Sequence, residues 1–203
     1  MKGLYLVTPD WDDTERLLEV TEAALEGGVT LLQYRHKTAT PALRLAQASA
    51  LLALCRRFGC PFIINDHVGL CLEIGADGVH VGGTDAPVAA VRAQIGPGLL
   101  LGASCYGDLA LARTAHAGGA SYVAYGGFYP SRVKKYPVTT DTAILAESRA
   151  AVPLPTVVIG GMAAENAAPL VAAGADMVAA ISSVYLTDDP RAAAAALARL
   201  FPH

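Results

Sequence analysis

Three polar side chains that follow one apolar run could bind a polyanion. Gln33, Arg35 and Lys37 come at every second position after the apolar residues 30–32. In an extended segment, side chains at this spacing point to the same face, so two cations and an amide would share one site. Arginine gives phosphate oxygens a forked contact and lysine gives a point charge, which suits a diphosphate. The alternative is a strand end whose charges are simply solvated.

Two carboxylates are candidate ligands for Mg2+. Asp66 directly follows the apolar run 62–64 and Asn65, and Asp85 lies in the loop after Gly78–Val81. Mg2+ usually takes one or two protein carboxylates and completes its coordination shell with water and phosphate oxygens. A pair of carboxylates beside a cationic pocket therefore predicts Mg2+ as a cofactor. Asp66 could instead cap a helix that begins just after it.

A separate phosphomonoester site is predicted near the C-terminal end of the chain. Gly160 and Gly161 lead from an apolar run into a helix-like segment, and Ile181 and Ser182 repeat this arrangement. Backbone N–H groups at the start of a helix can hold a phosphate without a cationic side chain. Simple turn glycines are the alternative.

The longest basic stretch punctuated by Gly and Pro covers residues 126–137. It contains Ser131, Arg132, Val133 and Lys134. Such a loop could close over a bound anion and exclude water. It could also be a surface loop whose charges face solvent. We assign no role in the chemistry to the histidines or to the four cysteines.

The elements that position these residues form a repeating pattern. Short apolar runs without polar alternation are typical of strands covered on both faces of a parallel sheet. Helix-like amphipathic or Ala/Leu-rich segments separate them. The expected strands are Leu4–Thr8, Thr30–Arg35, Phe62–Asn65, Gly78–Val81, Leu99–Ser104, Tyr122–Gly126, Thr156–Gly161 and Met177–Ser182.

Eight such units in 203 residues predict an α/β fold, a (β/α)8 TIM barrel that forms a single domain over residues 1–203. Segments such as Gly75–Val79, Gly119–Val123 and Gly174–Val178 support it, because each reads as a helix ending in Gly that leads into a strand. A doubly wound sheet would instead need about six strands and a Gly-rich loop after the first one. Here Thr8–Asp13 follows the first strand and contains no glycine. In a barrel, the polar residues named above would meet at the C-terminal ends of the strands.

Composition excludes several classes of protein. The chain is 53% hydrophobic and 16% charged, with a net charge of -3, which argues against disorder and against a nucleic-acid partner. Mean hydropathy is +0.40, yet no apolar run approaches the roughly 18 residues of a membrane-spanning helix. We expect a cytoplasmic protein with reduced cysteines, no membrane partner and the option of forming a homo-oligomer.

These parts suit a transferase. Cations and Mg2+ would stabilise a diphosphate as it leaves, and a second, monophosphorylated molecule held nearby would be the acceptor. The residue types contain no nucleophile–base triad and no lysine within a strand for a Schiff base. The residues themselves name neither substrate.

Ordered segments over nearly the full length resemble the thiamine-phosphate synthase family. They are GLYLVT, GGVTLLQYRHK, PFIINDHVGLCLEIGADGVHVG, GASCYGDL, ASYVAYGGFYPSRVKK, VVIGGMAAENA and VAAGADMVAAISSVY. The resemblance implies the barrel fold and an Mg2+-dependent reaction. In that reaction, 4-amino-5-hydroxymethyl-2-methylpyrimidine diphosphate and 4-methyl-5-(2-phosphoethyl)thiazole give thiamine phosphate and pyrophosphate. It also implies that the diphosphate leaves first and that the thiazole nitrogen captures the resulting cation.

The resemblance also assigns residues. It places the Mg2+ ligands at Asp66 and Asp85. The catalytic side chains would be Arg35, Lys37, Ser104 and Lys134, and Gln33 and Asn65 complete the diphosphate-binding set. The thiazole-phosphate contacts would be Ser131, Arg132, Val133, Gly161, Ile181 and Ser182, and we include Tyr34 and His36 among the substrate-binding residues. His36 and Val133 depart from the family pattern, which more often has an acid and a threonine there.

Two other functions remain open at this stage. A thiazole tautomerase would share the barrel and the phosphate site but would have little use for the diphosphate-binding set and the carboxylates. A non-catalytic barrel that binds a phosphate ligand would bind without turnover.

Overall fold

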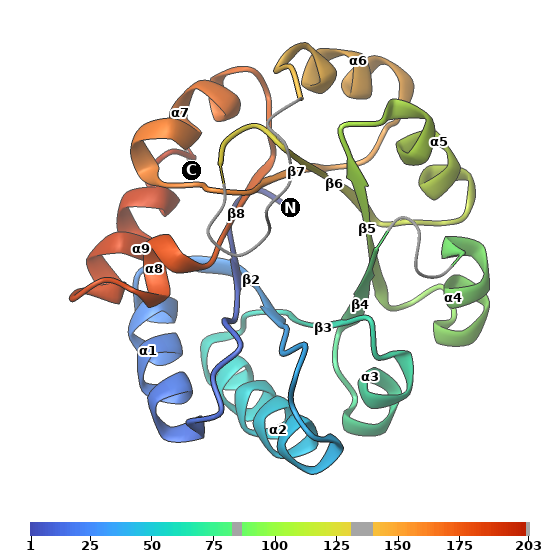
Figure 1. Cartoon of the computed structure of the whole chain (residues 1–203). Coiled ribbons are helices and arrows are strands. Elements are labelled where there is room, and N and C mark those ends of the chain that lie inside the picture. The colour runs from blue at the N-terminus through green and yellow to red at the C-terminus, as the bar shows by residue number, and fades with distance from the viewer. Residues whose placement is uncertain (83–86, 131–139, 202–203) are drawn as a thin grey trace.

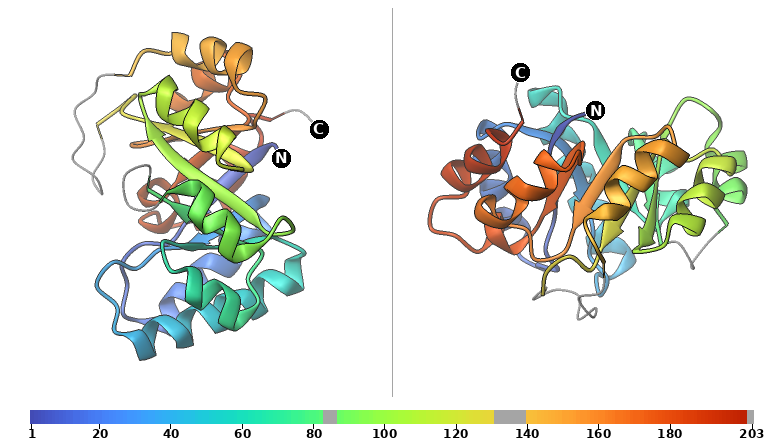
Figure 2. Two further views of the ribbon diagram at one scale, coloured as in Figure 1. Left: turned by 90° about the vertical axis from the view of Figure 1, so that its right-hand side faces the viewer. Right: turned by 90° about the horizontal axis from the view of Figure 1, so that it is seen from above.

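The computed structural model describes residues 1–82, 87–130 and 140–201. Within these residues, eight parallel strands form a closed barrel in which each strand pairs with the next and β8 pairs with β1. The helices surround this ring, as Figures 1 and 2 show from three directions. The predicted (β/α)8 barrel is therefore confirmed.

The strands and helices alternate along the chain. The strands are β1 (Gly3–Val7), β2 (Val29–Tyr34), β3 (Phe62–Asn65), β4 (Gly78–Val81), β5 (Leu100–Tyr106), β6 (Tyr122–Gly126), β7 (Thr156–Ile159) and β8 (Met177–Ala180). The helices are α1 (Thr14–Glu26), α2 (Pro41–Phe58), α3 (Val68–Ile74), α4 (Val88–Ile95), α5 (Leu109–Ala117), α6 (Ala143–Ala151), α7 (Ala164–Ala172), α8 (Ser182–Tyr185) and α9 (Pro190–Ala198).

Each predicted strand overlaps an observed one; the starts of β1, β2 and β5 differ by one residue, and the larger differences lie at the C-terminal ends. β7 stops at Ile159, two residues before the predicted end, because Gly160 and Gly161 adopt φ values of 104° and 64° that extended backbone does not allow. β8 stops at Ala180, since Ile181 turns the chain into α8. β5 runs on to Tyr106 through an irregularity in its pairing with β6.

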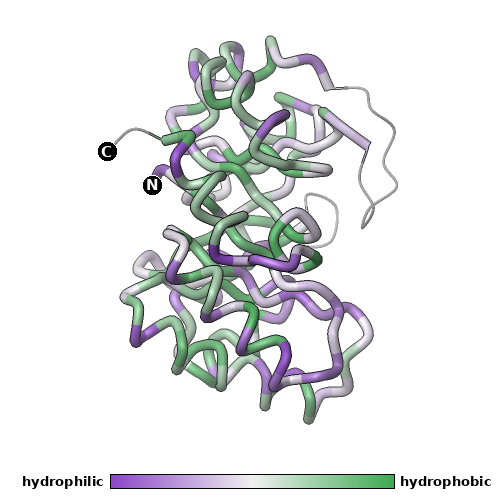
Figure 3. Tube along the Cα trace, turned by 90° about the vertical axis from the view of Figure 1, so that its left-hand side faces the viewer, coloured by the Kyte–Doolittle hydropathy of each residue, from purple (hydrophilic) through white to green (hydrophobic). Residues whose placement is uncertain are grey.

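Two apolar layers hold the barrel together. The inner layer fills the ring of strands and includes Tyr5, Leu31, Ile63, Tyr122 and Met177, all 0–1% exposed. The outer layer lies between the strands and the helices. Figure 3 shows hydrophobic and hydrophilic residues mixed along the helical segments, whose apolar residues pack toward the strands. Most strand residues are thus apolar on both faces, which explains the unbroken apolar runs in the sequence.

The repeated Gly-containing turns have a structural role at the N-terminal end of the barrel. In each, a glycine with positive φ lies at the C-cap of the helix or directly after it, and a polar residue two positions later accepts a backbone N–H from the first or second residue of a neighbouring strand. The glycines are Gly75, Gly119 and Gly174, and the acceptors are Asp77, Ser121 and Asp176, at 2.7, 3.0 and 2.9 Å. Each turn therefore ties two adjacent strands together.

Two further expectations concern the cysteines and the membrane. All four cysteines are buried and carry free thiols. In the part of the chain that the structure describes, none of the helices combines the length and apolar character needed to cross a bilayer.

Candidate active site

A cavity of about 470 Å3 opens at the C-terminal end of the barrel. This volume suits a small organic ligand. Its lining includes seven of the residues predicted from the sequence, which come from β2, β3 and β5, from the residue directly after β2 and from the turns after β7 and β8. They are Gln33, Arg35, Asn65, Ser104, Gly161, Ile181 and Ser182.

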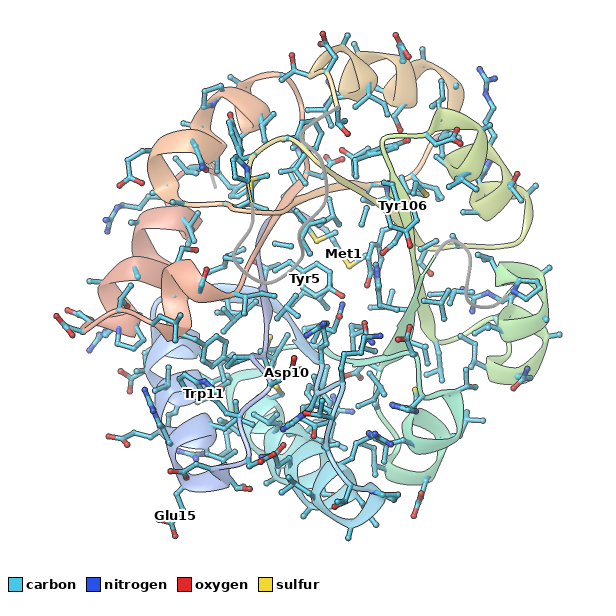
Figure 4. The ribbon with its side chains drawn as sticks, in the orientation of Figure 1. Met1, Tyr5, Asp10, Trp11, Glu15 and Tyr106 are labelled. Carbon is cyan, nitrogen blue, oxygen red and sulfur yellow. The ribbon has the colours of Figure 1, made fainter. Side chains whose placement is uncertain are left out.

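The cavity exists because small inward-facing residues lie above large ones. Within β6, Tyr122 fills the barrel and Ala124, two positions later, lines the cavity; in β8, Met177 and Ala179 do the same. Successive residues of a strand face opposite sides, so the inward positions are two apart. Figure 4 shows the side chains from above the barrel, with Tyr5 inside the ring of strands.

The end of β2 is held by the loop that follows β1. The Thr8 hydroxyl accepts a hydrogen bond from the Arg35 N–H (2.8 Å) and donates one to the Arg35 carbonyl (3.0 Å). The Asp10 carboxylate accepts from Arg35 Nη1 (3.1 and 3.2 Å) and from the Lys37 N–H (2.9 Å). These hydrogen bonds fix the backbone at Arg35, although β2 has ended at Tyr34, and the Arg35 side chain lines the cavity.

Lys37 lies beyond the end of β2, and its ammonium group pairs with Asp66 at the end of β3. Asn65 also donates a hydrogen bond to Asp66, at 2.7 Å. Burial alone would raise the pKa of Asp66, but the hydrogen bonds and the positive charge of Lys37 outweigh it and lower the pKa below its usual value. Asp66 is therefore a carboxylate, and not an acid, at neutral pH.

Asp66 does not cap the helix that follows it. His67 occupies the N-cap position of α3, and that end of α3 has no side-chain cap. Asp66 itself has φ of 61°, a conformation that a residue other than glycine rarely adopts and that tends to occur at functional sites. The helix-capping alternative for Asp66 is thus excluded by the geometry.

The donors at this edge of the cavity fit Mg2+. Asp66 and Lys37 are not part of the cavity lining but lie next to its lining residue Asn65. One partly exposed carboxylate beside an amide and a lysine is a suitable anchor, because Mg2+ takes few protein ligands and many phosphate or water oxygens. A cage of three or more His, Cys, Asp or Glu side chains does not occur within the described ranges. The second predicted ligand, Asp85, lies outside the described residues.

The opposite edge of the cavity is built from the turns after β7 and β8. Gly161 has φ of 64°, and a Cβ there would overlap the Pro130 carbonyl oxygen. Asn166 fixes the turn, because its amide donates to the Gly161 carbonyl and accepts from the Ala163 N–H, both at 2.8 Å. Ser182 is the first residue of α8. Both turns therefore form part of the cavity wall.

Tyr34 and His36 do not line the cavity, contrary to the expectation that they contact substrate. The Tyr34 hydroxyl donates to Gln47 of α2 at 2.9 Å, and His36 Nε2 lies 3.0 Å from the Asp12 carboxylate. Both residues alternate with Gln33 and Arg35 and so face the helices. Ser131, Arg132, Val133 and Lys134 lie outside the described residues.

A polar group under the cavity was missed in the sequence. His80 lines the cavity, with Nε2 2.9 Å from the Ser104 hydroxyl and Nδ1 3.2 Å from the Tyr122 hydroxyl. The Tyr122 and Tyr5 hydroxyls lie 2.7 Å apart. Burial raises the pKa of both phenols, so they stay protonated. Its position in the sequence could have identified it, because His80 lies two residues after Gly78 and therefore on the inward face of β4.

Comparisons with known proteins agree with this geometry. Residues 4–184 match the family model described as thiamine monophosphate synthase. A thiamine-phosphate synthase from Janthinobacterium sp. (strain Marseille) is 68% identical over 201 residues, which cover 99% of this chain and 97% of the relative. One from Thiobacillus denitrificans is 52% identical, covering 98% and 94%.

Solved structures give the same result. A thiamine phosphate pyrophosphorylase from Pyrococcus furiosus has a TM-score of 0.85 and 32% identity, covering 98% of this chain and 94% of that one. A 3-hexulose-6-phosphate synthase, at 22% identity and a TM-score of 0.72, shares the fold. The cationic edge at β2 and β3, the glycine turn after β7 and the match over almost the entire length lead to one conclusion: this chain belongs to the thiamine monophosphate synthase family.

Proposed function

We propose that this protein joins 4-amino-5-hydroxymethyl-2-methylpyrimidine diphosphate to 4-methyl-5-(2-phosphoethyl)thiazole, forming thiamine phosphate and releasing pyrophosphate. The observation that carries the proposal is one cavity with two edges of different chemistry, each suited to an anion. Arg35 lies at one edge, and Gly161 and Ser182 lie at the other. A transferase that joins a diphosphate to a monophosphate needs both edges in the same cavity.

At the first edge, the cationic side chains bind the diphosphate. The bond between the pyrimidine methylene carbon and the diphosphate oxygen breaks, and its electron pair leaves with the diphosphate. Arg35 and Lys37 stabilise the growing negative charge, with Asn65 and Ser104 as further polar contacts. By the family resemblance, we assign Lys134 to the same role. The positive charge left on the methylene carbon explains why the reaction needs no general base.

At the second edge, backbone N–H groups of the turns hold the phosphate of the thiazole. Gly161 and the Ile181–Ser182 turn would orient this substrate so that its ring nitrogen forms the new bond to the methylene carbon. By resemblance, we add Ser131, Arg132 and Val133 to these contacts. Fixing both substrates in one cavity also limits access of water to the cation.

We further propose that Asp66 and Asp85 hold Mg2+. Bound there, the ion would supply charge stabilisation to the departing diphosphate. The ionised state of Asp66 and its position beside Asn65 support this assignment. Lys37 pairs with the same carboxylate, so the cation and the metal would share it at the diphosphate edge.

The test is an endpoint assay with purified protein, both substrates and Mg2+, in which thiamine phosphate is oxidised to the fluorescent thiochrome. We expect product with the wild-type protein and a loss of product without Mg2+ or with Asp66→Ala. Asp13→Ala is the matched control, because Asp13 is also a loop carboxylate but caps α1 away from the cavity. Absence of product from a folded wild-type protein that still binds the thiazole phosphate would refute the proposal and leave the tautomerase or the non-catalytic barrel.

A further inference from the structure

We propose that Tyr5, Tyr122 and His80 are positioning residues that form a directional hydrogen-bond relay between Gln33 and Ser104. The relay fixes Gln33 as an acceptor and Ser104 as a donor toward the ligand. This inference deepens the proposed function and rests on it, because it specifies how two cavity residues are held ready for their substrate. The relay itself can be observed without substrate.

The relay joins five strands under the cavity. Gln33 Nε2 of β2 donates to the Tyr5 hydroxyl of β1, which lies 2.7 Å from the Tyr122 hydroxyl of β6. The Tyr122 hydroxyl lies 3.2 Å from His80 Nδ1 of β4, and His80 Nε2 lies 2.9 Å from the Ser104 hydroxyl of β5. Gln33 and Ser104, the two ends, both line the cavity.

The direction of the relay follows from its first bond. An amide nitrogen can only donate, so the Tyr5 oxygen accepts and its own proton is directed to the Tyr122 oxygen. Tyr122 then donates to His80 Nδ1. A neutral imidazole that accepts at Nδ1 carries its proton at Nε2, and that proton goes to the Ser104 oxygen. The Ser104 proton is left to donate to a ligand, and the Gln33 carbonyl oxygen is left to accept.

The opposite direction would reverse both ends. If His80 carried its proton at Nδ1, each hydroxyl would point the other way, and the Gln33 amide would flip to present its NH2 group. Ser104 would then donate to His80 and present only lone pairs to the ligand. A diphosphate oxygen requires a donor, so only the direction described above makes Ser104 a suitable contact for it. In the same direction the Gln33 carbonyl oxygen faces the ligand, so Gln33 would contact a donor group of the substrate and not a diphosphate oxygen, contrary to its expected place in the diphosphate-binding set.

Burial keeps the relay in one arrangement. Tyr5 is 1% exposed and Tyr122 is 0% exposed, so a broken bond would leave a polar group unpaired away from water. Burial also raises the pKa of both phenols, which therefore remain able to donate. The His80 and Tyr122 rings stack, with centroids 5.7 Å apart.

Gly102 of β5 makes room for this contact. A Cβ at Gly102 would overlap both the Tyr122 hydroxyl and His80 Nδ1. Gly102 is not among the glycines with positive φ, so its backbone conformation would accept alanine. The absence of a side chain at this position therefore serves the relay and not a turn.

The first experiment measures the His80 tautomer by long-range 1H–15N NMR in the substrate-free protein, with His80→Gln used to assign the signal. We expect a proton at Nε2 in the wild-type protein. Tyr122→Phe removes the donor to Nδ1, so we expect the tautomer preference to weaken or reverse. A wild-type His80 protonated at Nδ1 would overturn the proposal.

The second experiment compares the kinetics of isosteric variants. We expect Tyr5→Phe and Tyr122→Phe to lower kcat/KM by roughly 10- to 100-fold, the effect of one buried group left unpaired. The double variant should lose little more than either single one, because one break already interrupts the relay. Gly102→Ala should behave like Tyr122→Phe.

Tyr125→Phe is the matched control. Tyr125 lies on the same strand as Tyr122, is 0% exposed and donates its hydroxyl proton to Ser148 at 2.8 Å, but it faces the helices. We expect it to lower stability as much as Tyr122→Phe does and to leave activity unchanged. Equal activity of the Tyr122 and Tyr125 variants would refute the relay. An inactive wild-type protein with the expected tautomer would refute the proposed reaction and not the relay.

Discussion

Gly161→Ala tests whether the turn after β7 holds the monophosphate. Gly161 has φ of 64°, where a side chain costs about 1–2 kcal/mol. The new Cβ would in addition overlap the Pro130 carbonyl oxygen, so the turn must move. Hydrogen bonds to a charged group contribute about 1.5–3 kcal/mol each. Loss of one backbone N–H contact would therefore raise KM for the thiazole phosphate roughly 10- to 100-fold.

Gly59→Ala separates the two effects of this substitution. Gly59 ends α2 with φ of 62°, and a Cβ there meets no atom within 4 Å. Both variants should therefore share the backbone penalty of about 1–2 kcal/mol in urea unfolding. Only Gly161→Ala should raise KM for the thiazole phosphate, with KM for the diphosphate nearly unchanged. If steady-state kinetics give the two variants the same KM values, the phosphate does not bind at this turn.

Three further outcomes follow from the geometry. Asp176→Ala should lower the unfolding free energy by about 1–3 kcal/mol in urea titrations, because the Thr156 N–H at the start of β7 loses its acceptor. An unchanged unfolding free energy would show that this hydrogen bond does not stabilise the pairing of β7 with β8. Asp66→Asn should change stability by less than about 1 kcal/mol, since its ion pair with Lys37 is partly exposed, but should raise the Mg2+ concentration needed for half-maximal activity. Among the described residues, burial raises the pKa of five tyrosines, that of Tyr34 to about 12, so the folded chain retains protons that the unfolded chain releases. The contribution of these five tyrosines to stability should be constant below about pH 10 and then fall by up to about 1.4 kcal/mol per pH unit per tyrosine, and the absorbance of their tyrosinates should appear only on unfolding.

The barrel could be predicted because its strands are apolar on both faces and its helices end in recurring glycines. The residues at which the strands end could not be predicted in the same way, since they depend on the local backbone conformation. Gly160 and Gly161 continue an apolar run in the sequence, yet their positive φ values end β7 before them. Arg35 likewise follows the strand, held by Thr8 from a different loop.

The site residues likewise divide into those that strand alternation predicts and those that depend on contacts between distant segments. The alternation of β2 extends beyond its last residue to Arg35 and His36, so that Gln33 and Arg35 line the cavity while Tyr34 and His36 contact Gln47 and Asp12. Lys37 lies past the end of the strand, where alternation no longer determines which way a side chain points. Its pairing with a carboxylate on the next strand required the closed barrel.

The relay could not be found by any local pattern, because its central bond joins residues 117 positions apart in the chain. An aliphatic layer would close the barrel with less need for specific partners. Tyr5 and Tyr122 instead bury two hydroxyls that are stable there only because each one is paired. Replacing paired polar groups with apolar ones of the same shape can leave stability nearly unchanged. The presence of this polar layer is therefore better explained by the orientation that it gives Gln33 and Ser104 in the cavity than by its contribution to the stability of the fold.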